Sequence, residues 1–376
     1  MNKRIVVNAP LNQLSFGNVS YNLLKEFYKM GQEILLLPHS NFDLSSFDGA
    51  DPKFVQWLVD SAKDNLSRLD KDDVALKLWH VSGSHELSAR KQVLFSFYEL
   101  DSPTETEKSV VSYQDATIFS SRHARDLFSD CGNVNFVPLG FDTDLKFMEK
   151  EYFDKDVVHF TLMGKAEKRK NTSKIIKTWI DTFGGDQKYK LTCLINNGHV
   201  KEDWVKAFQA DILSGREGKM SNVSFLPTLP KNSQMNDLLC SSDIDLTCLS
   251  GAEGWNLPAF NVACLGGAVI GNSFTSHGDW AQDCAKFFEV SSGFVTEPAA
   301  DGVFFNSQGD FNVGNIMKLE DTTELVEVMK TVAGKVLSWK SDICYLTHKK
   351  FFGTQMQNKF PYAKTAKSII EIIEKL

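Results

Sequence analysis

A run of cationic residues follows a predicted strand in the C-terminal half of the chain. The sequence G-K-A-E-K-R-K-N connects a strand over 157–163 to a helix over 172–182 and contains Lys165, Arg169 and Lys170. Cationic side chains at a strand-to-helix turn can bind phosphate together with the free N–H groups of the helix. The alternative is a charged, solvated surface. The position of the run at the turn favours phosphate binding.

A second candidate site lies in the sequence S-G-A-E-G-W-N-L-P, which follows a predicted strand over 244–249. A helix beginning near Pro258 would present free N–H groups and the positive end of its dipole to an anion. The single carboxylate of the loop, Glu253, needs a task other than binding phosphate. A hydroxyl-rich ligand that carries a phosphate would use both groups. The alternative is a helix start at which Glu253 only interacts with the dipole.

Polar residues also follow predicted strands in the first half of the chain. His80 ends one strand, His85 lies in the loop after it, and Glu99 and Asp101 follow the next strand. Ligands of doubly wound sheets bind beyond the carboxyl ends of the strands, so these four side chains are candidate substrate contacts. The alternatives are satisfied polar groups at strand ends and, for His85, simple solvent exposure.

The elements that must position these residues alternate between strand and helix. A strand over 4–8, a helix over 18–30 and a strand over 34–37 form a βαβ start, which indicates a parallel sheet. Gly17, at the first loop–helix junction, either lets a ligand approach the backbone or serves only as a turn residue. The alternation restarts after a charged segment over 142–156, which we interpret as a linker.

The other predicted elements continue this alternation and indicate an α/β protein. We expect helices over 51–69, 122–129, 202–213, 233–240, 322–337 and 365–376. We expect strands over 74–81, 92–98, 116–121, 135–139, 190–195, 222–226 and 268–270. The segment from residue 272 to about 314 has no clear periodicity, and such a long irregular stretch is often a functional loop.

Composition limits the kind of protein. A chain of 376 residues with 42% hydrophobic and 24% charged residues fits two globular domains. The net charge of −7 gives no general basic field for nucleic acid, although a local basic groove stays open. No apolar run predicts a membrane span, and the N-terminus lacks the features of a signal peptide. Together with seven unpatterned cysteines, this predicts a cytoplasmic protein with reduced thiols.

Four motifs, in order, resemble those of retaining glycosyltransferases of the GT-B fold, close to glycosyltransferase family 4. F-S-F-Y-E-L-D-S resembles the strand end M-F-E-T-D, and I-F-S-S-R-H-A-R-D-L-F with V-P-L-G-F-D-T-D resembles a strand–helix unit and its closing strand. F-T-L-M-G-K-A-E-K-R-K-N resembles the motif G-R-x-x-x-R-K-G. S-G-A-E-G-W-N-L-P-A-F-N-V-A-C-L-G-G resembles S-x-x-E-G-F-G-L-P-x-L-E-A-M-A-C-G. The motifs span about residues 95–270.

The resemblance implies a GT-B fold, in which two Rossmann-like domains face each other across a cleft. Residues 1–150 would form the N-terminal domain on the acceptor side. Residues 151–360 would form the C-terminal domain, which binds the nucleotide-sugar donor. Residues 361–376 would form a crossover helix that packs on the N-terminal domain.

The resemblance also implies roles for individual residues. Lys165 and Lys170 would hold the donor diphosphate with assistance from Arg169, and Glu253 would contact the hydroxyls of the donor sugar. The loop whose N–H groups meet the phosphate and the sugar would be formed by Gly254, Trp255, Asn256 and Leu257. These residues are the donor side of the predicted site.

The sequence departs from the family pattern at Asn261, Lys165 and Asn256. Asn261 stands where a second glutamate normally binds the nucleotide ribose; it can still form a hydrogen bond with a hydroxyl but lacks the charge. Lys165 replaces an arginine and loses bidentate geometry, and Asn256 replaces a glycine. The histidine that family members place near the sugar would be His80 or His85.

The implied reaction moves a sugar from a UDP- or GDP-sugar to an acceptor hydroxyl with retention of the anomeric configuration. Lys165, Lys170 and the amides near Gly254 would neutralise the leaving phosphate, so we expect no metal and no cofactor besides the nucleotide sugar. A D-x-D sequence, Asp243–Asp245, resembles the metal site of another glycosyltransferase fold. It lies at the start of a predicted strand, which argues against that role.

The acceptor is left open by the sequence and could be a glycan, a protein or a modified nucleobase. A nucleobase in duplex DNA would have to be flipped out into a basic cleft, and the net charge does not indicate nucleic acid. Two other functions stay open. One is a GT-B-type nucleotide-sugar epimerase, and the other is an inactive sugar-nucleotide-binding scaffold, which Asn261 favours.

Overall fold

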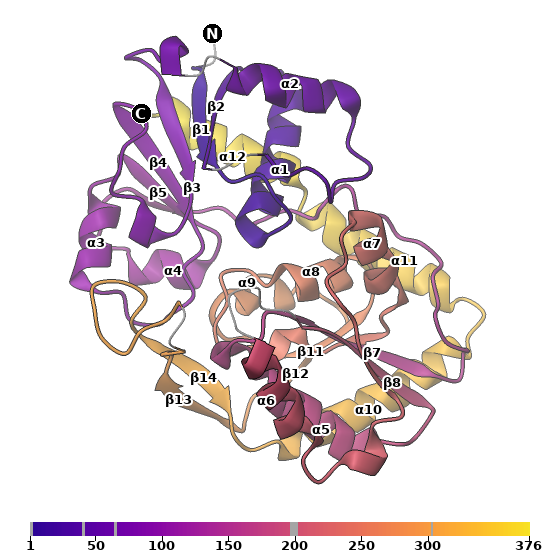
Figure 1. The fold of residues 1–376 in the computed structure, drawn as a ribbon. Helices are drawn as coiled ribbons and strands as arrows, with labels where there is room; N and C mark the ends of the chain where they lie inside the picture. The colour runs from indigo at the N-terminus through magenta and orange to yellow at the C-terminus, as the bar shows by residue number, and fades with distance from the viewer. Residues whose placement is uncertain (1–2, 40–41, 64–65, 196–201, 302–303) are drawn as a thin grey trace.

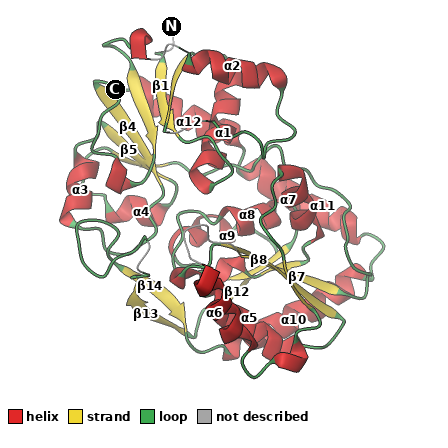
Figure 2. Ribbon diagram, in the orientation of Figure 1, coloured by secondary structure: helices red, strands yellow, loops and turns green. Residues whose placement is uncertain are grey.

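Two parallel sheets, each covered by helices, form two lobes (Figures 1 and 2). The computed structural model describes residues 3–39, 42–63, 66–195, 202–301 and 304–376. The first sheet has the order β2-β1-β3-β4-β5-β6 and the second the order β12-β11-β10-β7-β8-β9. Because parallel strands end at the same edge, each sheet directs its carboxyl-terminal loops to one side.

The strands of both sheets are short and mostly apolar. The first sheet contains β1 (Ile5–Ala9), β2 (Ile34–Pro38), β3 (Val74–Leu78), β4 (Lys91–Ser96), β5 (Ala116–Phe119) and β6 (Val134–Phe136). The second contains β7 (Val158–Gly164), β8 (Tyr189–Ile195), β9 (Val223–Phe225), β10 (Ile244–Asp245), β11 (Ala268–Gly271) and β12 (Phe287–Glu289). A separate antiparallel hairpin is made of β13 (Phe294–Pro298) and β14 (Asn315–Leu319).

The helices cover the faces of the sheets. Those of the first lobe are α1 (Ser15–Met30), α2 (Pro52–Ala62), α3 (Glu105–Ser112) and α4 (Arg122–Leu127). Those that follow are α5 (Thr172–Phe183), α6 (Glu202–Leu213), α7 (Asn232–Ser241), α8 (Leu257–Cys264), α9 (Gly278–Ala281), α10 (Thr323–Lys340), α11 (Tyr345–Lys359) and α12 (Tyr362–Glu374). Helix α1 ends as expected at Gly31, whose φ of 67° lets it donate to Tyr28 O and Phe27 O in a left-handed cap.

The C-terminal helix α12 crosses back and packs against α1 of the first lobe (Figure 1). Its apolar face, which includes Ile369 and Ile373, is buried in the same cluster as the core of the first lobe. The start of α12 lies directly against Gly140 of the first lobe. A Cβ added at Gly140 would lie 2.4 Å from the backbone nitrogen of Tyr362. Phe141 N donates to Phe360 O at 2.7 Å at the same crossing.

Some elements differ from the sequence-based expectation. The predicted strand over 244–249 stops at Asp245, because this side chain accepts from the backbone N–H of Thr247 and turns the chain into a short 3₁₀ helix. The predicted helix over 51–69 ends at Ala62. The irregular segment contains β12, α9 and the strand β13, which pairs with β14 across a long loop that no short turn signal announces.

The helices α3 and α11 have no counterpart among the predicted elements. Helix α11 buries Tyr345, Lys349, Gly353 and Met356. A lysine and a glycine on the buried face hide its apolar periodicity from sequence analysis. Lys349 is accommodated there because its Nζ donates to two backbone carbonyls, at 2.7 and 2.8 Å.

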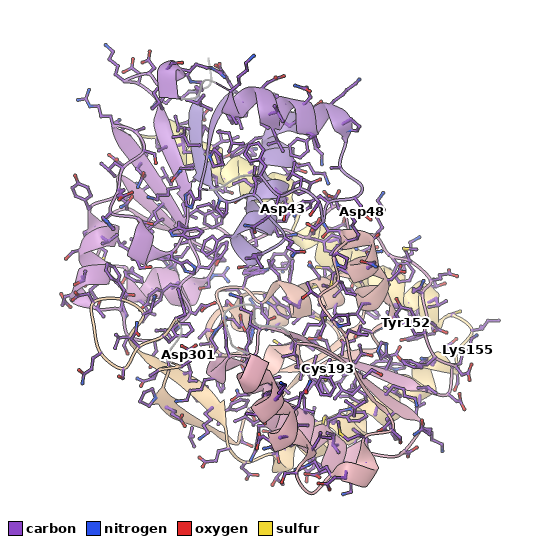
Figure 3. The ribbon with its side chains drawn as sticks, in the orientation of Figure 1. Asp43, Asp48, Tyr152, Lys155, Cys193 and Asp301 are labelled. Atoms are coloured by element: carbon purple, nitrogen blue, oxygen red, sulfur yellow. The ribbon has the colours of Figure 1, made fainter. Side chains whose placement is uncertain are left out.

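The two lobes contact each other directly on both sides of the cleft. Asp48, labelled in Figure 3, accepts from the backbone N–H of Ser233 at 3.2 Å. On the opposite side, Arg122 forms an ion pair with Asp279 at 2.8 Å. No helix in the described part of the chain is long and apolar enough to cross a lipid bilayer.

Candidate active site between the lobes

The loop after β7 carries the cationic run and is held in place by a left-handed turn. Gly164 has a φ of 129°, a conformation that other residues rarely adopt. A short 3₁₀ turn, Lys168–Lys170, follows it, and Asn171 with a φ of 54° leads into α5. The Asn171 amide donates to Leu249 O at 2.9 Å. The turn is thereby attached to the segment that leads into the loop over 250–256, the glycine loop.

The loop before α8 is shaped by Asn256. Its φ of 66° lies in the left-handed region, which asparagine tolerates better than most residues and which explains why it can replace glycine here. Its Nδ2 donates to Thr247 O at 3.1 Å and to His277 Nε2 at 3.0 Å. His277 Nε2 is therefore the acceptor, and its Nδ1–H donates to Asn272. Both side chains fix the loop from its buried side.

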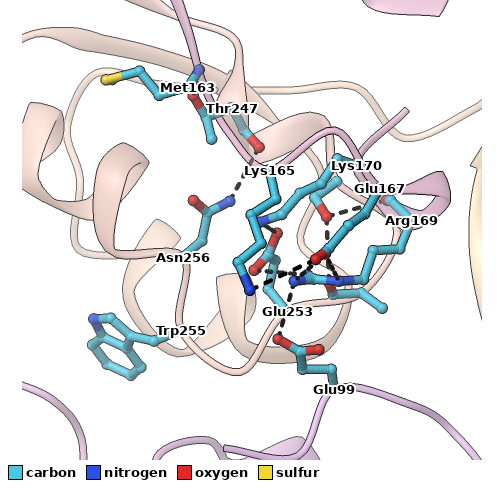
Figure 4. A network of polar contacts seen from close by, with 12 residues as sticks. Glu99, Met163, Lys165, Glu167, Arg169, Lys170, Thr247, Glu253, Trp255 and Asn256 are labelled. Atoms are coloured by element: carbon cyan, nitrogen blue, oxygen red, sulfur yellow. Dashed lines mark hydrogen bonds and ion pairs between the residues drawn. The ribbon is translucent and has the colours of Figure 1, made fainter. Parts of the chain in front are cut away.

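Arg169 stands at the centre of an ion network that joins both lobes (Figure 4). Its guanidinium lies 3.1 Å from Glu253, 2.9 Å from Glu167 and 3.3 Å from Glu99 of the first lobe. Lys170 Nζ contacts the other carboxylate oxygen of Glu253. Two of the predicted phosphate-binding cations and the predicted sugar-binding carboxylate are thus brought together and are paired with one another.

The network separates the pKa values of its carboxyl groups. Burial alone would raise the pKa of Glu253, but Lys170 and Arg169 outweigh it and lower that pKa to about 2. Burial raises the pKa of Glu99 to about 7, although Arg169 opposes the increase. Burial alone would lower the pKa of Arg169, but Glu99 and Glu253 outweigh it and raise that pKa. Glu253 is therefore ionised at neutral pH, while Glu99 is near its midpoint.

A cavity of about 440 Å³ lies between the lobes beside this network. The second lobe lines it with Lys165, Glu167, Arg169, Lys170, Glu253 and Phe304. The first lobe lines it with Ser15, Phe16, His80, Phe97 and Glu99. The volume lies in the range of small-molecule sites. One wall is charged, and the other is mainly aromatic.

The glycine loop presents unused backbone donors to this cavity. In the described part of the chain, the N–H groups of Gly254, Trp255 and Asn256 have no hydrogen-bond acceptor. These three residues and Leu257 line the cavity at the amino end of α8. The Trp255 side chain points away from the ion network (Figure 4) and packs against Phe260 at 5.3 Å between ring centroids. The arrangement can receive an anion through backbone amides and the helix dipole.

The imidazole ring of His80 lies among the aromatic side chains of the first-lobe wall. Its ring centroid lies 4.6 Å from that of Phe16 and 4.8 Å from that of Phe304. Burial lowers the pKa of His80 to about 4, with contributions from Lys165 and Arg169. His80 is therefore neutral at pH 7, with one ring nitrogen that donates a hydrogen bond and one that accepts.

Ten predicted site residues line the cavity between the lobes. They are Lys165, Arg169, Lys170, Glu253, Gly254, Trp255, Asn256, Leu257, His80 and Glu99. Lys165 is 47% exposed and lies 3.8 Å from Glu167, so it is the least constrained of the cations in this wall.

The other predicted residues lie elsewhere. His85 is exposed and lines neither this cavity nor its neighbour. Asp101 accepts from the backbone N–H of Asn315 at 2.8 Å and so holds the β13–β14 hairpin to the first lobe. Asn261 does not line the cavity, and its buried Oδ1 has no hydrogen-bond partner among the described residues. Gly17 lines the neighbouring cavity, and a Cβ there would lie 2.3 Å from Asn12 Oδ1.

The two aspartates of the D-x-D sequence are engaged inside the second lobe. Asp243 accepts from Lys340 Nζ and Tyr345 Oη, both at 2.9 Å. Asp245 accepts from the Thr247 hydroxyl at 2.8 Å. Across the described ranges, no group of three or more His, Cys, Asp or Glu side chains is arranged to hold a metal ion.

Several site residues are not marked by the sequence motifs. Glu167 lies inside the cationic run, and the alternating charges there are the signal that could have indicated its pairing with Arg169. Thr275 accepts from the backbone N–H of Glu253 at 3.1 Å with a φ of 51°, which is strained for a β-branched residue. Phe16 and Phe304 come from segments that no motif marks, and only the fold brings them together.

Comparison of the sequence with protein-family profiles and with curated proteins gives no match. Comparison of the structure does. The chain is similar to trehalose-6-phosphate synthase from E. coli bound with UDP-2-fluoroglucose, with a TM-score of 0.64 and 12% identity over 100% of this chain and 99% of that one. It is also similar to sucrose-phosphate synthase from Thermosynechococcus elongatus, with a TM-score of 0.67 and 11% identity over 99% and 98% of the two chains.

A third similar structure is HepE from Anabaena in complex with UDP, with a TM-score of 0.62 and 13% identity over the full length of both chains. At such low identity these similarities establish the fold. The chain has the GT-B fold over its whole length, which confirms the fold class predicted from the sequence.

Proposed function

We propose that this protein is a glycosyltransferase that moves a sugar from a nucleotide-diphosphate sugar to an acceptor hydroxyl, with retention and without a metal ion. The observation that carries the proposal is that Lys165, Arg169, Lys170 and Glu253 line one cavity between the two lobes together with the free amides at the amino end of α8. Cations and amides suit a diphosphate, and an ionised carboxylate suits sugar hydroxyls.

The similar structures support the choice of donor. The E. coli synthase is bound with UDP-2-fluoroglucose, and HepE is in complex with UDP. UDP-sugars are therefore the first donors to test. No metal is invoked because Lys165, Lys170 and the loop amides supply the positive charge that the leaving diphosphate needs.

The proposed reaction breaks the bond between the anomeric carbon and the β-phosphate oxygen. The acceptor oxygen forms its bond to that carbon on the same face, and its proton passes to the leaving phosphate oxygen. Lys165 and Lys170 stabilise the negative charge that develops on the phosphate. Glu253 holds the donor sugar through its hydroxyls, and its low pKa keeps it an acceptor throughout.

Donor turnover tests the proposal. The protein is incubated with a panel of UDP- and GDP-sugars, and the release of the nucleoside diphosphate is measured together with the identity of the sugar. Release of the diphosphate supports a transferase. An altered sugar that remains attached to the nucleotide would indicate an epimerase, and no change in any donor would indicate a binding scaffold.

Two variants test the site itself. Glu253→Gln and Lys170→Met should each lower turnover more than about tenfold, which corresponds to about 1.4 kcal/mol of lost transition-state stabilisation. Lys168→Met is the matched control, because Lys168 lies in the same turn but pairs with Glu297 outside the cavity, at 2.5 Å. Wild-type rates in the first two variants would contradict the assignment.

A further inference from the structure

A second cavity, of about 700 Å³, opens beside the first on the side of the first lobe. The two cavities share Ser15, Phe16, His80 and Lys165 in their walls. Arg169 and Lys170 line the first cavity and not the second, so a molecule in the second cavity would approach the donor sugar from the side of the first lobe. Its volume is large enough for a mono- or disaccharide.

Lys77 lines this second cavity from inside a buried strand. Side chains of β3 alternate between the sheet faces, so Val74, Leu76 and Leu78 pack in the main core while Lys77 shares the other face with Ala75. An apolar residue would be ordinary at such a position. Lys77 is 5% exposed, and a buried ammonium is costly unless it has partners.

The described residues satisfy only part of the hydrogen-bonding capacity of Lys77. Its Nζ donates to the backbone carbonyl of Glu86 at 3.0 Å. The described part of the chain gives it no second acceptor and no ion-pair partner, whereas the ammonium has three N–H donors. The Glu86 carboxylate is exposed and acts on Lys77 only from a distance. Two donors of a buried cation therefore remain for a ligand.

Polar and aromatic groups suited to a sugar surround Lys77. Asn8, its register neighbour on β1, accepts from His39 Nε2 at 2.9 Å. The His39 ring lies 4.6 Å from Trp79, and burial, followed by the charge of Lys77, lowers the pKa of His39 to about 4. His39 is neutral and does not compete for an anion. Trp79 offers the kind of flat apolar surface on which a sugar ring can pack.

We propose that the acceptor of this enzyme carries an anionic group, a phosphate or a carboxylate, which Lys77 binds in the second cavity while the acceptor ring packs on Trp79. The identification of this ligand as the acceptor depends on the proposed function. The alternative role for Lys77 is structural, since its bond to Glu86 O attaches the loop after β3 to the sheet. A structural role would give no preference between charged and neutral ligands.

Binding of three probes distinguishes these roles. Glucose 6-phosphate, glucuronate and glucose are titrated calorimetrically into the wild-type protein, with and without saturating UDP. We expect at least one charged sugar to bind about tenfold or more tightly than glucose, since hydrogen bonds to charged groups are the stronger class. Tighter binding of glucose 6-phosphate would indicate that the anionic group of the acceptor is a phosphate. Tighter binding of glucuronate would indicate that it is a carboxylate.

The preference for charged sugars should disappear in Lys77→Met and in Lys77→Gln. The glutamine variant is included in case Lys77→Met does not fold, because its side chain keeps a donor for Glu86 O. The preference should persist in Lys91→Met, because Lys91 also donates from a strand of this sheet to a main-chain oxygen, that of Leu376, but lies outside the cavity. Equal affinities for charged and neutral sugars, no binding of any probe, or a preference that survives in a folded Lys77 variant would overturn the proposal. Donor turnover by the wild-type protein, measured separately, shows whether the proposed function has failed instead.

Discussion

The two walls of the cleft are built in opposite ways. The wall of the second lobe is charged, and its buried cations are paired with carboxylates: Arg169 contacts three of them and Lys170 contacts Glu253. The wall of the first lobe is aromatic and carries neutral histidines. Its buried cation, Lys77, has a single carbonyl as a partner among the described residues.

This difference concerns how each wall receives a ligand. A diphosphate entering the second-lobe wall must compete with carboxylates that already hold the cations, and this wall keeps its shape without a ligand. The first-lobe wall offers donors that have no partner among the described residues, so a ligand adds bonds there without breaking any within the protein. The second-lobe wall therefore contributes stability as well as binding, and the first-lobe wall contributes mainly binding.

The largest expected effect comes from removing the centre of the paired wall. Arg169→Met leaves Glu99, Glu167 and Glu253 buried with less positive charge around them, and we expect the free energy of unfolding to fall by about 3–5 kcal/mol. Arg125→Met is the control, since Arg125 pairs on the surface with its neighbour Asp126, and it should change stability by less than about 1 kcal/mol. Similar denaturation curves for both variants would mean that the network adds little to the fold.

A smaller effect should follow pH through Glu99. Its carboxyl stays protonated up to about pH 7 in the folded protein but only to about pH 4.3 in the unfolded chain. At this carboxyl the folded state binds more protons in this window, so the contribution of Glu99 to stability falls as pH rises, by up to about 3 kcal/mol. The pKa values of His39, His80, His159 and His277 are lowered by burial, so these histidines contribute in the opposite direction. In urea unfolding, Glu99→Gln should therefore gain stability relative to the wild type as pH rises from about 4.5 to 7.5.

Glu253 provides the comparison for that titration, because its pKa is shifted in the opposite direction. Its contribution to stability is present above about pH 4.3 and is lost as pH falls towards 2. The Glu253 charge also contributes to the raised pKa of Glu99, so Glu253→Gln should move the Glu99 titration to lower pH, whereas Glu99→Gln removes it. Identical pH profiles for the two variants would mean that the two carboxyl groups do not titrate separately.

A glycine where the two walls touch tests how closely they are packed. A Cβ added at Gly254 would lie 2.6 Å from the Phe97 Cβ of the first lobe, so Gly254→Ala should destabilise the protein by about 2 kcal/mol and lower donor turnover. Gly334→Ala is the matched control. Gly334 is exposed within α10 and an added Cβ meets nothing within 4 Å, so this change should raise stability by up to about 1 kcal/mol.

The alternation of strands and helices could be predicted because parallel strands buried on both faces read as apolar runs. The strand expected over 157–163 is β7, Val158–Gly164. Elements escape prediction where buried positions hold polar residues, as in α11 with Lys349, because burial there depends on partners distant in sequence. The β13–β14 pairing escapes it for the related reason that its two strands are far apart in the chain.

The same distinction applies to the site. Residues of the charged wall lie in two short stretches, so the resemblance could group Lys165, Lys170 and Glu253 from their motifs alone, and all three line one cavity. The aromatic wall is assembled from separate segments, and no local pattern links Phe16 with His80 and Phe97. His80 and His85 could not be distinguished by sequence, since both follow the same strand and only burial separates them.

The smallest effect on stability is expected at Lys165. This residue tests whether a cation of the charged wall can be weakly paired within the protein, as Lys77 is among the described residues of the other wall. Lys165 is 47% exposed and lies 3.8 Å from Glu167, so Lys165→Met should change the free energy of unfolding by less than about 0.5 kcal/mol. It should nevertheless weaken nucleoside diphosphate binding about tenfold in calorimetry, because one charge-assisted contact to the phosphate is lost. A large loss of stability would place Lys165 with Arg169 as a structural cation. Unchanged affinity would remove it from the donor site and leave Lys170 and the loop amides to hold the diphosphate.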